Sequence, residues 1–194
     1  MTWRDWRDKQ RLETFELYSR GTMTCSLCPE SRVQVLDIDH IFGGGRKAYA
    51  AATSNSAYYT SILKEADQNK YRILCRNCNH LTFLTGRSLS QDKESIRVRN
   101  YYRRLRLNLH SIYGNICSFC SENRLDVLDL DHVTGGGGRE RKLKEPPTTR
   151  LLRFIAEADL TKYRILCRNC NWIAHRKGTD GRQDDTEEAV GIRA

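Results

Sequence analysis

The chain has 194 residues, 39% of them hydrophobic, and a formal net charge of +9. This length fits one or two small domains, and no apolar run approaches the length of a membrane helix, so we expect no membrane partner. Residues 179–194 contain five acidic and two basic side chains, which leaves the rest of the chain still more basic. Such an excess of positive charge favours a polyanionic partner, above all nucleic acid.

The first predicted element is a helix from Trp3 to Tyr18, where large apolar residues recur at helical spacing. Its acidic and basic side chains nearly balance. We therefore interpret it as a packing helix rather than a DNA-binding surface, and assign residues 1–24 to an N-terminal helical segment.

A Cys-x-x-Cys pair follows, and the β-branched and aliphatic residues from Val33 to Ile41 predict a strand that leads into Asp39-His40. Gly43 to Lys47 is predicted to be a turn or open loop. Its backbone amides, with Arg46 and Lys47 beside them, could cradle a phosphate, or the loop could be only a flexible hairpin tip.

The sequence predicts no regular structure for residues 48–57. A helix is expected from Tyr58 to Ala66, a short strand from Tyr71 to Leu74, and a second helix from about Asn77 to Thr85 that ends before Gly86.

Residues 87–116 are predicted to be a linker with a basic helix from about Ser95 to Ser111. This helix could contact a nucleic-acid backbone or be merely solvated, and it also leads into the second half of the chain. The basic residues that we single out as nucleic-acid contacts are Arg46, Lys47, Arg97, Arg99, Arg103, Arg104, Arg106 and, in the second half, Arg139.

The second half repeats the first. Tyr71 to Asn79 recurs without change from Tyr163 to Asn171, 92 residues later, and the residues upstream align at the same offset. An ungapped period of this kind indicates duplication of one folded unit. We assign the modules to residues 25–86 and 117–178. Pro146-Pro147 is predicted to exclude a helix at that point, and residues 179–194 to form a disordered acidic tail.

All the cysteines fall in Cys-x-x-Cys pairs, two pairs in each module. Paired knuckles at this spacing predict one structural zinc ion per module, two in all, which would staple modules too short for large cores. The predicted ligands are Cys25, Cys28, Cys75 and Cys78 in the first module and Cys117, Cys120, Cys167 and Cys170 in the second. The alternative is disulfides in a secreted domain. The charged first residues do not look like a secretion signal, so we expect a reducing, cytoplasmic setting.

Each module places Asp-His at the end of its first strand and an asparagine directly after the last cysteine. If zinc ties the helix to the base of the strand, Asp39, His40 and Asn79 can converge. Adjacent strand residues point to opposite faces, so Asp39 and His40 share a site only if the strand ends or twists there. The same reasoning applies to Asp131, His132 and Asn171.

Cys-x-x-Cys, Asp-His and then Cys-x-x-Cys-Asn resembles the ββα-metal (His-Me finger, or HNH) nucleases, and most closely the phage recombination endonuclease VII type. The resemblance implies a small α+β fold of two tandem, zinc-stapled ββα-metal modules joined by a basic helix. It also implies a phage-encoded DNA endonuclease that would work in the cytoplasm of the host cell.

The resemblance further implies one Mg²⁺ or Mn²⁺ per module, bound by Asp39 and Asn79 in the first and by Asp131 and Asn171 in the second. His40 and His132 would be general bases in phosphodiester hydrolysis. His175, one turn after Asn171, is a candidate third ligand or only an exposed polar residue; its counterpart is Phe83.

Two modules in one chain suggest a monomeric pseudo-dimer that cuts both strands of duplex or branched DNA, although a homodimer is also open. The competing hypothesis is a catalytically silent zinc module that binds nucleic acid. RNA as the substrate is not excluded by any feature of the chain.

Overall fold

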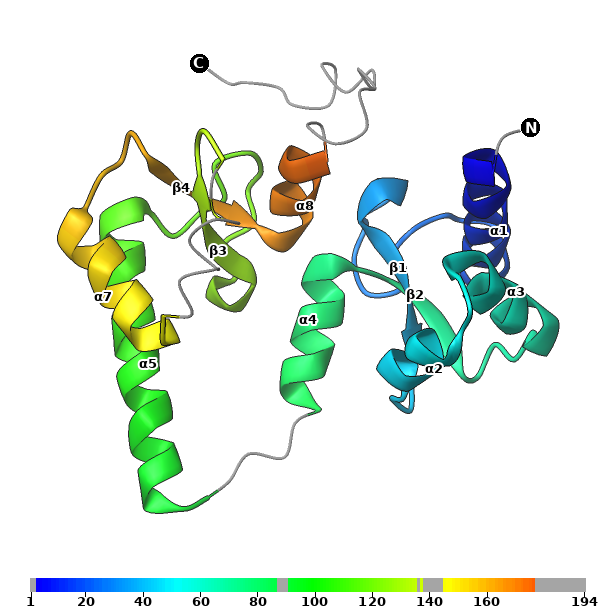
Figure 1. Cartoon of the computed structure of the whole chain (residues 1–194), viewed down its shortest axis with the longest axis horizontal. Coiled ribbons are helices and arrows are strands. Elements are labelled where there is room, and N and C mark those ends of the chain that lie inside the picture. Colours follow the sequence, from blue (N-terminus) through cyan, green and yellow to red (C-terminus); the bar gives the residue numbers. More distant parts are fainter. Residues whose placement is uncertain (1–2, 87–90, 136, 138–144, 177–194) are drawn as a thin grey trace. The chain divides into compact units, whose positions relative to one another are not determined.

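The computed structural model describes residues 3–86, 91–135, 137 and 145–176. The chain divides into two compact units, Met1–Thr82 and Phe83–Ala194, which are described separately. Each unit contains helices around one small antiparallel sheet of two strands (Figure 1). This confirms the expected mixture of helices and short strands. Arg139, the acidic tail and residues 87–90 of the linker lie outside the described residues.

In the first unit, a long helix precedes the cysteine knuckle, and a hairpin with helical insertions leads to a closing helix. The elements are α1 (Trp3–Tyr18), a 3₁₀ turn η1 (Val33–Val35), β1 (Leu36–His40), α2 (Gly45–Ala51), α3 (Asn55–Glu65), β2 (Tyr71–Cys75) and α4 (Arg76–Thr85), whose last residues pass the unit boundary. Leu36 pairs with Cys75 and His40 with Tyr71, so the strand end that carries Asp39-His40 lies beside the start of β2.

Apart from α2, for which the described residues give no counterpart, the second unit repeats this order. Its elements are α5 (Lys93–Tyr113), η2 (Leu125–Val127), β3 (Leu128–His132), α7 (Pro147–Glu157), β4 (Tyr163–Cys167) and α8 (Arg168–Arg176). Leu128 pairs with Cys167 and His132 with Tyr163, which is the register of the first unit shifted by 92 residues.

The structure corrects three predictions about the connections. Gly43 to Lys47 is not wholly a turn or open loop, because Gly45, Arg46 and Lys47 are the first residues of α2. Residues 48–57 are largely helical, because α2 runs from Gly45 to Ala51 and α3 begins at Asn55, where the Ser54 hydroxyl accepts a hydrogen bond from the Ala57 amide. Pro146-Pro147 does not exclude a helix either. Pro147 is the first residue of α7, a position at which the missing amide hydrogen costs nothing and the fixed φ suits the helix.

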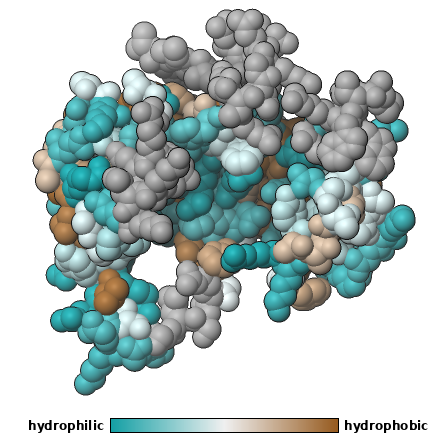
Figure 2. All heavy atoms as spheres, in the orientation of Figure 1, coloured by the Kyte–Doolittle hydropathy of each residue, from teal (hydrophilic) through white to brown (hydrophobic). Residues whose placement is uncertain are grey.

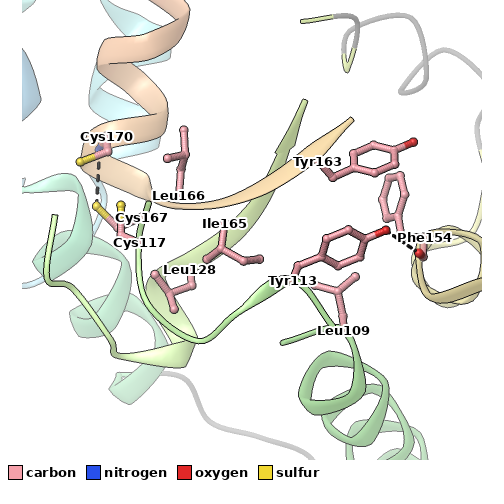
Figure 3. Close-up of a cluster of buried hydrophobic side chains, with 10 residues drawn as sticks. All are labelled: Leu109, Tyr113, Cys117, Leu128, Phe154, Tyr163, Ile165, Leu166, Cys167 and Cys170. Carbon is pink, nitrogen blue, oxygen red and sulfur yellow. Dashed lines mark hydrogen bonds between the residues drawn. The ribbon is translucent and has the colours of Figure 1, made fainter. Parts of the chain in front are cut away.

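The leading helices pack in the same way in both units, as expected for α1. Tyr18 Oη donates to the Ile62 carbonyl at 3.0 Å, and Tyr113 Oη donates to the Phe154 carbonyl at 2.8 Å (Figure 3). Ile62 and Phe154 correspond at the offset of 92 residues, whereas Tyr18 and Tyr113 lie 95 residues apart. The duplication therefore includes the leading helix, and the two copies differ by three residues between this helix and the first cysteine.

An arginine fastens each leading helix to its 3₁₀ turn. One guanidinium nitrogen of Arg11, Nη2, donates to the carbonyls of Val33 and Leu36 at 2.9 and 2.8 Å. Arg106 Nη2 donates to the carbonyls of Leu125 and Leu128 at 2.7 and 2.9 Å. These carbonyls immediately precede or begin the first strand, so the arginines hold the helix to the strand that carries Asp-His.

The core of the second unit lies between α5, α7 and the sheet. Leu109 and Tyr113 of α5 meet Phe154 of α7 and the inner face of β4, and the cysteines close one end of this cluster (Figure 3). Within the described ranges, no helix is both long and apolar enough to cross a membrane.

Candidate functional site: two cysteine clusters and an Asp-His strand end

The four cysteines of each module converge on one point. In each group the sulfur atoms all lie within 4.8 Å of one another. The Sγ atoms of Cys28 and Cys75 are 3.7 Å apart, and Cys120 Sγ lies 3.8 Å from Cys167 Sγ and 3.7 Å from Cys170 Sγ. A tetrahedral zinc ion with bonds of about 2.3 Å needs sulfurs about 3.8 Å apart. Both groups could therefore hold a structural zinc ion.

The disulfide alternative does not fit this geometry, because a disulfide bond joins sulfurs only about 2.0 Å apart. All eight cysteines are free thiols. Backbone amides also point at the sulfurs: the Cys78 amide donates to Cys75 Sγ at 3.5 Å and the Cys170 amide to Cys167 Sγ at 3.4 Å. Such donors stabilise thiolates, which are the form that binds zinc.

The thiols of the first cysteine cluster also differ in pKa. A hydrogen bond from Cys75 lowers the pKa of Cys25 to about 4, whereas burial raises the pKa of Cys78 to about 12. Without a cation, the thiolate form is thus favoured at Cys25 and disfavoured at Cys78. A bound zinc ion would remove this conflict by supplying positive charge to all four sulfurs.

Two of the three residues predicted to bind an ion in the second unit, Asp131 and His175, are in contact. His175 Nε2 lies 2.8 Å from Asp131 Oδ1, so α8 does bring its histidine to the strand end. Asp131 is nearly buried, with a side chain 3% exposed, while that of His175 is 48% exposed. Arg168 on the same helix lies 3.6 Å from Asp129. Asn171 stands between Arg168 and His175 on one helical face, and that face therefore covers the aspartates.

The first unit has only part of this arrangement. Asp39 and Asn79 occupy the same positions on β1 and α4, and both are half-buried. Where α8 carries His175, α4 carries Phe83, which is 58% exposed. The sequence difference between the modules is thus a difference in the number of side chains that could bind an ion.

Each aspartate also has a partner that sequence analysis missed. Arg72 Nε donates to Asp39 Oδ2 at 2.8 Å, and Arg164 Nε donates to Asp131 Oδ2 at 3.0 Å. Each arginine lies directly across the sheet from its aspartate. Both pairs therefore follow from the strand register, which the structure provides.

The two Asp-His histidines lie on the other face of their strands, as the alternation of strand residues requires. His40 packs edge-on against Tyr71, with ring centroids 4.8 Å apart, and His132 packs likewise against Tyr163 at 4.9 Å. The Nε2 atoms of both are buried. Burial lowers the pKa of His40, although Asp39 and Glu65 oppose this shift. The neutral ring, which can accept a proton, is therefore favoured.

A glycine borders the Nδ1 atom of each histidine. A Cβ atom on Gly45 would lie 2.7 Å from His40 Nδ1, and one on Gly137 would lie 3.0 Å from His132 Nδ1. The preceding Gly43 and Gly44 have φ angles of 78° and 90°, which glycine adopts most readily. The glycine run thus has two functions: its first residues turn the chain, and its third leaves room beside the histidine.

The structure separates the predicted nucleic-acid contacts into surface and packing residues. Arg46, Lys47, Arg97, Arg103 and Arg104 are exposed, and Arg99 is half-buried. Arg106 is different, because its guanidinium is already engaged by two backbone carbonyls. We therefore reassign Arg106 from nucleic-acid binding to packing.

Comparisons of the chain with family models, with curated proteins and with solved structures gave no match.

Proposed function

We propose that this protein is a metal-dependent endonuclease that hydrolyses phosphodiester bonds in DNA. The contact between His175 and Asp131 carries this proposal. Two neighbouring ligands of an octahedral Mg²⁺ or Mn²⁺ ion, at about 2.1 Å from it, lie about 3.0 Å apart. The distance of 2.8 Å between Nε2 and Oδ1 is close to that separation. Asn171, on the same helical face, would supply a further oxygen.

The residues would act as follows. Asp131, Asn171 and His175 would hold the ion, and Asp39 and Asn79 would do so in the first module. The ion would supply positive charge to stabilise the negative charge that develops on the phosphate and the leaving oxygen. His132 and His40 would accept a proton from the attacking water at Nδ1, because their Nε2 atoms are buried. Each histidine is the last residue of its strand.

The alternative function is a catalytically silent zinc module that binds nucleic acid. The first module favours this function for itself, because Phe83 replaces the histidine ligand. The arginine beside the aspartate does not distinguish the modules, since Arg72 and Arg164 pair with Asp39 and Asp131 alike. If only the second module cuts, the chain would nick one strand rather than cut both as a pseudo-dimer.

The deciding experiment is cleavage of supercoiled plasmid by zinc-loaded protein with added Mg²⁺ or Mn²⁺. The preparation should first be shown to contain two zinc ions per chain. We expect cutting that requires added metal and disappears in a His40→Ala/His132→Ala double variant. The absence of cutting of plasmid, single strands and a four-way junction, with binding retained, would support the silent module instead.

A reciprocal pair of variants tests which module cleaves DNA. His175→Phe gives the second module the residue of the first, and Phe83→His does the opposite. We expect His175→Phe to reduce nicking strongly. We expect Phe83→His to leave it unchanged or to increase the share of linear product. Equal activity of wild type and His175→Phe would show that His175 is only an exposed polar residue.

A further inference from the structure

The leading helices α1 and α5 are equivalent inside the protein but have diverged on the outside. Their buried sides make the same contacts through Arg11 and Tyr18 in one and Arg106 and Tyr113 in the other. Apart from Arg11, α1 carries four acidic and three basic side chains, whereas α5 has a single acidic residue, Glu94, in its first turn. The shared contacts account for the fold of both helices, so the added charge of α5 needs another explanation.

Three arginines of α5 lie close together on its exposed side. A hollow in the surface there is lined by five residues, which we call the basic stripe: Arg97, Asn100, Arg103, Arg104 and Leu107. The spacing of three or four residues places them in one row. Figure 2 shows the first turns of this helix, at the lower left, covered mainly by hydrophilic side chains.

The charges of the basic stripe are poorly neutralised within the protein. Arg97 forms an exposed pair with Glu94 at 3.1 Å. Arg103 and Arg104, however, have neither an ion pair nor a hydrogen bond within the part of the chain that the structure describes. Like charges at this spacing destabilise a helix slightly. A bound polyanion would turn this repulsion into attraction.

We infer that the basic stripe binds the phosphate backbone of nucleic acid, and that only the second module makes this contact. From Arg97 to Leu107 the helix rises about 15 Å, which matches about four phosphates along one strand of B-form DNA. An acidic protein partner is a poorer match, because tight protein interfaces are built around buried apolar anchors and Leu107 is the only apolar member. The module with the histidine ligand is thus also the module that would hold the substrate.

This inference rests on the proposed function only in its choice of DNA, and it can be tested without cleavage. An Asp39→Asn/Asp131→Asn protein should be used as the reference, so that any cutting does not disturb the measurement. Its binding to a fluorescent duplex would be followed by anisotropy over a range of salt concentrations. The variant Arg97→Ala/Arg103→Ala/Arg104→Ala would be compared with Arg46→Ala/Lys47→Ala, which removes exposed cations from the first module.

We expect the triple variant to bind about 30-fold more weakly. The slope of log affinity against log salt concentration should also become shallower by about 3. Arg46→Ala/Lys47→Ala should change the affinity less than twofold. An equal or larger effect of that variant would overturn the assignment to the second module, as would the absence of DNA binding. If polyglutamate displaced the fluorescent duplex as well as unlabelled DNA does, the inference that the basic stripe binds nucleic acid would be overturned. If the unmodified chain bound DNA normally but did not cleave it, the result would contradict the proposed endonuclease activity and leave the inference about the basic stripe intact.

Discussion

Replacement of Arg106 by alanine should destabilise the second unit without any direct effect on DNA contacts. The guanidinium donates two hydrogen bonds to the carbonyls of Leu125 and Leu128. Hydrogen bonds to a charged group contribute about 1.5–3 kcal/mol each. Because Arg106 is only half-buried, water can reach part of the vacated space, and we take the lower value for both bonds. The free energy of unfolding should then fall by about 3 kcal/mol.

The measurement is urea unfolding of zinc-loaded protein in a Trp3→Phe/Trp6→Phe background, which leaves Trp172 as the only tryptophan and hence a reporter of the second unit. In thermal unfolding, the same loss should lower the midpoint by about 12 °C or more for a unit of this size. Arg104→Ala, on the exposed side of the same helix, is the control and should change stability by less than about 0.5 kcal/mol. Equal stability of the two variants would refute the packing role of Arg106.

Three further changes test the site and its surroundings. Arg164→Gln removes the cation that occupies Asp131 Oδ2, so Mn²⁺ affinity, measured by paramagnetic resonance, should rise by about tenfold or more; a fall would show instead that Arg164 positions the carboxylate. Gly45→Ala puts a Cβ against His40 Nδ1, so the ring should move outward and its pKa, followed by NMR, should rise toward the ordinary value of about 6.5, with zinc content unchanged; an unmoved pKa would show that the space is not needed. Burial lowers the pKa of His110, so its contribution to stability is complete above pH of about 6.5 and decreases as the pH falls below that value; His110→Phe should therefore lose less stability than wild type between pH 7 and pH 5 in urea unfolding, and equal losses would contradict this.

The repeated segments allowed the sheets and the closing helices to be predicted closely. Tyr71–Asn79 contains a strand that ends at a cysteine and a helix that begins directly after it, and its copy behaves identically. The local pattern was sufficient because one face of each strand is buried and the knuckle fixes where the strand stops. The cysteine spacing likewise predicted both clusters.

The equivalence of α1 and α5 could not be read from the sequence. Their alignment shifts by three residues relative to the rest of the repeat, and their buried positions differ in chemistry, with Thr14 and Phe15 in one and Leu109 and His110 in the other. What they share is an arginine and a tyrosine whose partners are backbone carbonyls. Every residue has a backbone carbonyl, so the residue that accepts such a hydrogen bond cannot be recognised from its side chain.

The site itself was partly predictable. The helical spacing made His175 a candidate ligand for the same ion as Asn171, and His175 does lie beside Asp131. The convergence of Asp39 and His40 required the strand to end or twist, and instead Asp39 contacts Arg72 while His40 packs against Tyr71 on the other face. The roles of Arg72 and Gly45 were missed, because the first depends on strand register and the second on an approach between a backbone and a ring in three dimensions.

The helices α1 and α5 are held in their modules by the same arginine and tyrosine contacts, so one helix could replace the other. In each module the leading helix is held by an arginine, which contacts the 3₁₀ turn and the first strand, and by a tyrosine seven residues later, which contacts the inserted helix α3 or α7. The connection between the leading helix and the first cysteine differs by three residues between the two modules, so this connection tolerates insertion. Sequence change on the outer side of the helix can therefore set what a module binds while its architecture stays constant, and a chimera carrying α5 in both places should fold with two equivalent basic surfaces.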